Sequence, residues 1–151
     1  MTTEGTSGGP SLDEMIQLLR DAFPDAVVAQ IKTAAFFSLD EKHWPNFATI
    51  VWGDDHDLGN PSDLARPGVF RVNVSVDGPT FERLVGSQTD PDYAAMDRFM
   101  PHPVYAKQRW ISIINPSDRT TREVLLPLIA TAHDRFVTQR RGAADDTQTR
   151  R

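Results

Sequence analysis

Hydrophobic residues first recur at helical spacing near the start of the chain. Five of them lie three or four positions apart: Leu12, Met15, Ile16, Leu19 and Phe23. Ser11 and Glu14 have the spacing of a capping box, in which each side chain accepts a backbone amide hydrogen at the helix start. The pattern predicts a helix that begins after Ser11 and ends before Pro24.

The hydrophobic period then changes from helical spacing to alternation. Four segments rich in β-branched and aromatic residues are separated by turn residues: 26–31, 34–39, 47–52 and 69–76. In the fourth, one face would carry Phe70, Val72, Val74 and Val76, and the other would carry Arg71, Asn73 and Ser75. This alternation is typical of an antiparallel sheet with one face on the core and the other open to solvent.

The second half of the chain predicts two more helices and a fifth strand. A short helix follows Pro79 and ends near Gly86, and a strand occupies residues 109–114. A long final helix has the core stripe Thr121, Leu125, Leu128, Ala132 and Phe136. Pro127 lies inside that helix, where it is expected to kink it or to remove one hydrogen bond.

The expected fold is therefore α+β, with about five antiparallel strands and with helices packed mainly on one face, in the order α-β-β-β-β-α-β-α. A chain of 151 residues with 39% hydrophobic residues suits one core. Residues 11–139 form the expected single domain, and the polar segments 1–10 and 140–151 are expected to be disordered tails.

Composition narrows the classes of function. Sixteen basic and 21 acidic residues give a net charge of −5, which provides no global attraction to nucleic acid or to an anionic membrane. The chain has no cysteine, so disulfides, thiolate metal sites and cysteine nucleophiles are excluded. Without an apolar span or a signal peptide in the sequence, we expect a cytoplasmic protein that does not contact a membrane.

The acidic run at residues 54–57 offers carboxylate and imidazole groups that could bind a metal ion. Adjacent residues of an extended chain point in alternating directions, and the run lacks the spacing of a calcium-binding loop. The pattern therefore favours a solvated loop, and we expect neither a metal site nor a cofactor.

The segment FMPHPVYAKQRW, residues 99–110, is the stretch richest in reactive side chains, and we call it the connector. His102 could act as a general base with Asp97 and Ser112, but no known catalytic spacing joins the three. The prolines on either side of His102 restrict the backbone and indicate a rigid connector into the next strand. Its aromatic residues could instead stack on a flat ligand, with Lys107 and Arg109 supplying charge.

Two stretches, RPGVFRVNVSV and MPHPVYAKQRWISIINPSD, resemble a family of uncharacterised proteins common in high-GC Gram-positive bacteria. The chain is also similar to the MmcQ/YjbR-like group, in which a tyrosine precedes a K-x-H-W strand. Tyr105, Lys107 and Trp110 match that pattern, whereas Arg109 and Ile111 replace the group's histidine and asparagine. The resemblance implies a helix-flanked antiparallel sheet of the "double wing" kind and, from the group's usual label, DNA binding.

These observations favour a binding or regulatory module over an enzyme. The ligand, a small molecule or a protein, would contact the polar sheet face or the connector, through Arg71, Asn73, His102, Tyr105, Lys107, Arg109 and Trp110. The first alternative is nucleic-acid binding through Lys107, Arg109, Arg119 and Arg122, which the net charge disfavours. A small metal-dependent or hydrolytic enzyme is the third hypothesis, and both a monomer and a homodimer fit an open sheet.

Overall fold

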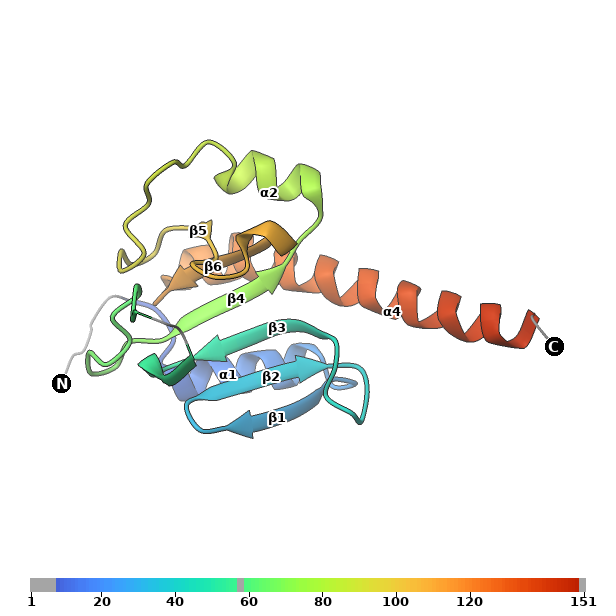
Figure 1. Ribbon diagram of the computed structural model, residues 1–151. Coiled ribbons are helices and arrows are strands. Elements are labelled where there is room, and N and C mark those ends of the chain that lie inside the picture. Colours follow the sequence, from blue (N-terminus) through green and yellow to red (C-terminus); the bar gives the residue numbers. More distant parts are fainter. Residues whose placement is uncertain (1–7, 57–58, 150–151) are drawn as a thin grey trace.

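The fold is α+β, as the sequence predicted, with helices beside one antiparallel sheet that has six strands where about five were expected (Figure 1). The computed structural model describes residues 8–56 and 59–149. The strands are β1 (Val27–Ile31), β2 (Ala34–Ser38), β3 (Asn46–Val51), β4 (Arg71–Ser75), β5 (Met100–Pro101) and β6 (Trp110–Ile114). They lie in the order β1-β2-β3-β4-β6-β5, and every neighbouring pair is antiparallel.

Two helices, α1 (Leu12–Ala22) and α4 (Leu126–Thr149), lie behind the sheet in the view of Figure 1. The sheet residues that face them share one side of the strands, including Phe37, Ala48, Ile50, Val72, Val74, Ile111 and Ile113. Burial of this apolar surface is the main force that holds helices and sheet together. The predicted capping box forms at the start of α1, where Ser11 and Glu14 each accept the other's backbone amide hydrogen.

The sixth strand, β5, lies at the start of the connector, where the sequence pattern predicted no strand. It is two residues long and pairs with β6 through Met100 and Pro101. Helix α2 (Gly78–Val85) lies beside the same edge of the sheet and contacts both strands. Proline-containing and short strands are common at sheet edges because proline cannot donate to the ladder.

The second face of the sheet is not open at its centre, which corrects the prediction from the alternating pattern. Every residue of β4 is buried, including Arg71, Asn73 and Ser75. Leu64 and Val69 of the loop over residues 52–70 pack on this face with Ala34, Val51, Met100 and Ile114. The loop has enough apolar residues to form a second, smaller core, and it therefore covers the polar row of β4.

The final helix begins with two short segments, α3 (Asp118–Thr120) and a π-helical turn (Thr121–Leu125). In that turn the Leu126 amide hydrogen reaches back five residues to the Thr121 carbonyl. The wide turn comes directly before Pro127, which has no amide hydrogen to donate, so the predicted irregularity takes the form of a π-bulge. The most buried positions of the stripe are Thr121, Leu125, Ile129 and Ala132, so Ile129 takes the place predicted for Leu128.

Helix α4 continues to Thr149 and projects past the sheet, whereas the sequence pattern predicted its end near Gln139 (Figure 1). Residues 140–149 contain no proline and a single glycine, so no strong helix breaker interrupts them. None of the helices within the described residues combines the length and the apolarity that crossing a bilayer requires.

The importance of the core face can be tested with two identical substitutions on different faces. Ile50 is fully buried against the helices, so Ile50→Ala should lower the free energy of unfolding by about 2–5 kcal/mol. Ile31→Ala is the matched control, because Ile31 is 55% exposed, and it should cost less than about 1 kcal/mol. Urea unfolding measures both values, and equal losses in the two variants would contradict this assignment of the core.

Candidate functional site

A hydrogen-bonded network of polar side chains lies on the second face of the sheet and centres on Asn73. The Asn73 Oδ1 accepts from Arg71 Nε at 2.9 Å and from the Ser112 hydroxyl at 2.7 Å. The Asn73 amide nitrogen donates to the Thr49 hydroxyl at 2.9 Å. We call Arg71, Asn73, Ser112, Thr49 and Ser62 the central network; it joins strands β3, β4 and β6 side by side.

Arg71 connects this network to the loop over residues 52–70. It is 1% exposed, and its Nη1 donates to the Ser62 hydroxyl at 2.8 Å. A buried charge is costly unless it is hydrogen-bonded, so these contacts fix the loop in the place where it covers the sheet. The same loop reaches a second loop through Arg66, whose Nη2 donates to the Ala94 carbonyl at 3.1 Å.

Ser75, the third polar residue of β4, is also held by an internal contact. Arg135 of α4 donates from Nη2 to the Ser75 hydroxyl at 2.8 Å. Burial lowers the pKa of the Arg135 guanidinium below its usual value, and the nearby Asp77 carboxylate partly opposes that shift. Each polar side chain of β4 therefore has a hydrogen bond within the fold. No observation tests whether Arg71 and Asn73 also contact a ligand, so that hypothesis stays a prediction.

His102 is buried, at 5% exposure, and it organises the backbone of the connector. Its Nδ1 accepts hydrogen bonds from the amides of Val104 and Tyr105, both at 3.0 Å. An Nδ1 that accepts two amide hydrogens carries no hydrogen itself, so the neutral ring has its hydrogen on Nε2. The ring also lies 5.0 Å from the Tyr105 ring, centre to centre.

The rest of the connector is fixed by a 3₁₀ turn, η2 (Ala106–Gln108), and by the residue after it. Arg109 has a φ of 64°, in the left-handed region, and its amide donates to the Ala106 carbonyl at 2.9 Å. Its own carbonyl accepts from the Val76 amide at 3.0 Å. A left-handed non-glycine residue persists only where its surroundings hold it, so this turn has a defined shape.

Several side chains of the connector are exposed to solvent. Tyr105 is 52% exposed, Lys107 and Arg109 are exposed, and Trp110 is half-buried at the start of β6. The structure therefore brings Tyr105, Lys107 and Arg109 onto one short turn. It places Arg71 and Asn73 in the central network, beneath the loop over residues 52–70.

The acidic loop has structural contacts in its described part. The Asp54 carboxylate accepts from the Leu64 amide at 2.9 Å, and the Thr33 hydroxyl donates to Asp55. Asp57 lies outside the described residues. Among the residues that the structure describes, no three acidic, histidine or cysteine side chains are grouped as metal ligands would be.

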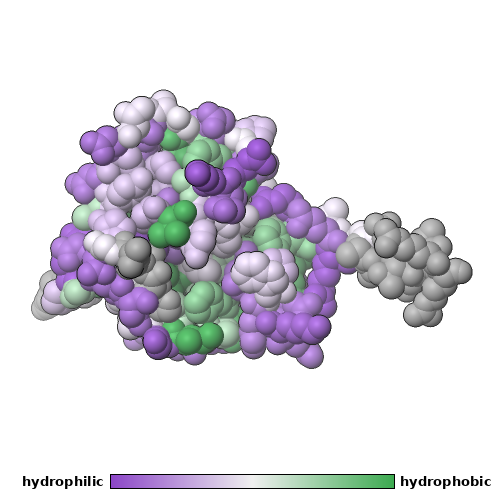
Figure 2. Space-filling view, in the orientation of Figure 1, coloured by the Kyte–Doolittle hydropathy of each residue, from purple (hydrophilic) through white to green (hydrophobic). Residues whose placement is uncertain are grey.

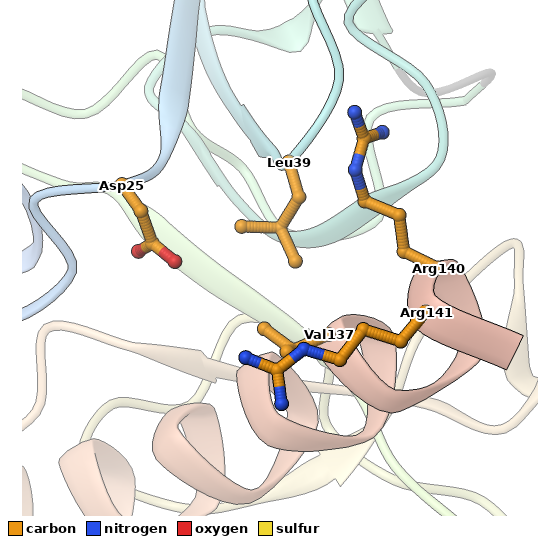
Figure 3. Close-up of a pocket in the computed structure, with 5 residues that line it drawn as sticks. All are labelled: Asp25, Leu39, Val137, Arg140 and Arg141. Atoms are coloured by element: carbon orange, nitrogen blue, oxygen red, sulfur yellow. The ribbon is translucent and has the colours of Figure 1, made fainter. Parts of the chain in front are cut away.

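A pocket that sequence reasoning missed lies between α4 and the adjoining ends of β1 and β2. It has a volume of about 370 Å³ and is lined by Asp25, Leu39, Val137, Arg140 and Arg141 (Figure 3). We call it the α4 pocket. Three separate chain segments form the pocket, so no local sequence motif could predict it.

A histidine beside the α4 pocket holds Asp25 in place. The Nε2 of His133 lies 2.8 and 2.9 Å from the two carboxylate oxygens of Asp25. The ring packs between Phe23, at 5.1 Å between ring centres, and Phe47, at 5.4 Å. The sequence offered no signal for this pair, because 108 positions separate the two residues.

Arg140 is engaged by the loop after β2. Its Nη1 lies 2.8 Å from the Asp40 carboxylate. A hydrogen bond from the Lys42 amide and the contact with Arg140 hold the pKa of Asp40 below its ordinary value. Asp40 is therefore ionised at neutral pH and keeps Arg140 beside this loop.

The fold and these sites define a small α+β domain with a helix-backed antiparallel sheet, a hydrogen-bonded exposed turn and an amphipathic pocket. Residues 10–145 match the model of a family described as "Family of unknown function (DUF6194)", and the chain belongs to that family. Comparison with curated proteins and with solved structures gives no match.

The role of His102 can be tested by giving the two amides a different acceptor. His102→Leu removes the acceptor of the Val104 and Tyr105 amides and should cost about 1–3 kcal/mol of the free energy of unfolding. In His102→Asn, the side-chain oxygen can accept from amides two and three residues ahead. This variant should therefore lose less than half as much free energy of unfolding as His102→Leu loses. Urea unfolding compares the two, and equal losses would mean that His102 acts through packing alone.

Proposed function

We propose that this protein is a non-catalytic binding module that recognises a partner through the exposed turn of the connector. The observation that carries the proposal is the double hydrogen bond to His102 Nδ1, which fixes the turn while Tyr105 stays 52% exposed. A recognition loop that is already in its bound shape loses little conformational entropy on binding. Tyrosine and arginine are also the residue types that dominate the energy of many interfaces.

The chemistry of the turn favours a partner with a negatively charged group. Tyr105 offers a ring and a hydroxyl, and Lys107 and Arg109 offer two cations within five residues. Two positive charges beside an aromatic ring suit an acidic peptide segment or another anionic surface. A protein partner is our choice between the two ligand classes that the sequence left open.

Two further observations support binding rather than catalysis. The polar side chains of the central network donate to and accept from one another, an arrangement that stabilises a fold. His102 uses its Nδ1 for two backbone amides, so that nitrogen is occupied and does not serve as a general base.

Figure 2 shows the face of the molecule that lies in front in Figure 1. Hydrophobic residues appear there as separate spots within a polar surface. Isolated exposed hydrophobic residues are normal for a folded protein and do not mark a broad apolar interface. On this face, the distribution favours recognition by a small polar element over docking on a large apolar surface.

The second candidate function is nucleic-acid binding, which the resemblance of Tyr105, Lys107 and Trp110 to the MmcQ/YjbR-like sequence pattern suggests. The observation in its favour is that Lys107, Arg109, Arg119 and Arg122 are all exposed. The net charge of −5 opposes it, because affinity for a polyanion depends on cations that neutralise phosphates.

The proposal can be tested with a thermal-shift panel of anionic probes at low salt. The panel contains an acidic peptide, nucleotides, and single- and double-stranded DNA, and a probe that prefers the folded state raises the Tm by mass action. We expect the acidic peptide to raise the Tm of the wild type and to have no effect on a Tyr105→Ala/Lys107→Ala double variant. Lys42→Ala removes an exposed lysine elsewhere and should keep the full shift.

The same panel separates the competing outcomes. A shift with the acidic peptide that persists in the double variant would place binding away from the connector. A shift with DNA alone that disappears at high salt would support the second candidate. A panel without any shift would contradict recognition of anionic groups by this turn.

A further inference from the structure

The α4 pocket combines opposite charges with an apolar wall. Asp25 belongs to the segment between α1 and β1, Leu39 follows β2, and Val137 and Arg141 belong to α4. In Figure 3 the Asp25 carboxylate and the Leu39 side chain point into the space that Val137 and the Arg141 guanidinium border from the helix. A ligand in this space would meet a carboxylate, a guanidinium and two hydrocarbon side chains.

The two arginines of the pocket are not equivalent. Arg140 extends away from Arg141 in Figure 3 and pairs with Asp40 at 2.8 Å. Arg141 forms no ion pair with the side chains of residues 8–55 and 59–142, and it is exposed. Arg141 is therefore the cation that remains available to a ligand.

Asp25 is the fixed anion of the pocket. Its side chain is 55% exposed, although both oxygens lie within 2.9 Å of His133 Nε2. Because His133 packs against Phe23 and Phe47, the carboxylate is held in one place by a ring that cannot swing freely. A carboxylate oxygen has more than one acceptor position, so Asp25 can bond His133 and a ligand together.

We propose that the α4 pocket binds a small zwitterion with an apolar side chain, of the class of the free hydrophobic α-amino acids. The ligand's ammonium group donates to Asp25, its carboxylate pairs with Arg141, and its side chain packs on Leu39 and Val137. The volume of about 370 Å³ lies at the small end of the usual range for ligand pockets, which suits a molecule of this size. This site is separate from the connector and does not depend on the function proposed for it.

The ligand class follows from the balance of groups. A simple anion would pair with Arg141 but would lie near the Asp25 carboxylate, and a simple cation would meet the reverse problem. A polar zwitterion without a side chain would leave Leu39 and Val137 in contact with water. Only a ligand with both charges and a hydrocarbon group uses each part of the lining.

The probe is L-leucine, titrated into the full-length, isotope-labelled protein while backbone amide shifts are recorded by NMR. The expected result is saturable shifts at residues 25, 39, 137 and 141. N-acetyl-L-leucine lacks the ammonium charge and L-leucinamide lacks the carboxylate, so each should bind at least about fivefold more weakly. Glycine, which lacks the apolar group, should also bind more weakly than leucine.

Three substitutions assign the groups on the protein. Asp25→Asn and Arg141→Gln should each weaken leucine binding at least about fivefold. Arg140→Gln is the matched comparison, because it removes the neighbouring guanidinium that pairs with Asp40, and it should weaken leucine binding less than Arg141→Gln does. Asn at position 25 keeps an oxygen that His133 can bond, and the dispersion of the amide spectrum shows whether each variant is folded.

Several results would overturn the proposal. One is the absence of amide shifts at leucine concentrations near its solubility limit, and another is equal affinity for leucine and N-acetyl-L-leucine. Amide shifts confined to the connector would show that leucine binds there and not in the α4 pocket. Equal losses in Arg140→Gln and Arg141→Gln would show that the pocket senses total charge and does not hold a ligand carboxylate at Arg141.

Discussion

The hydrogen bonds of Asn73 are the constraint on which the second face of the sheet depends. One side-chain amide accepts from Arg71 and Ser112 and donates to Thr49, so it joins three neighbouring strands. Burying an arginine requires such partners, and Arg71 in turn bonds Ser62 of the covering loop. The loop and the polar row are thus mutually dependent: the loop excludes water from the row, and the row holds the loop.

This arrangement also bears on the two sites proposed above. The polar groups at the centre of the sheet have partners within the fold, and both proposed sites lie at its margins. One margin is the connector turn, where His102 fixes the backbone beneath exposed Tyr105 and Lys107. The other is the α4 pocket, where His133 fixes the Asp25 carboxylate. In both places a partly or fully buried histidine positions groups that face solvent.

The sequence predicted the parts of the fold that depend on local periodicity. Alternation in residues 69–76 correctly separated Val72 and Val74 from Arg71 and Asn73, and the S-x-x-E spacing correctly marked the start of α1. What covers the polar face could not be read in this way, because Leu64 and Val69 belong to a loop without periodicity. The pairing of His133 with Asp25 could not be predicted from the sequence either, because it forms only when α4 packs beside the segment that follows α1. The prolines on either side of His102 indicated a restricted backbone in the connector. They did not indicate that His102 Nδ1 would accept two of its amide hydrogens.

Hydrogen exchange at the amides of Val104 and Tyr105 tests the central claim most directly, since that claim is that His102 holds the connector turn in one shape. The two residues are about half exposed, yet their amides donate to a buried acceptor. The account predicts that both amides exchange far more slowly than in an unfolded chain, and that this protection disappears in His102→Leu while the amides of β4 keep theirs. Exchange at the unfolded rate in the wild type would show that the turn is not preformed and would contradict its proposed role as a rigid recognition element.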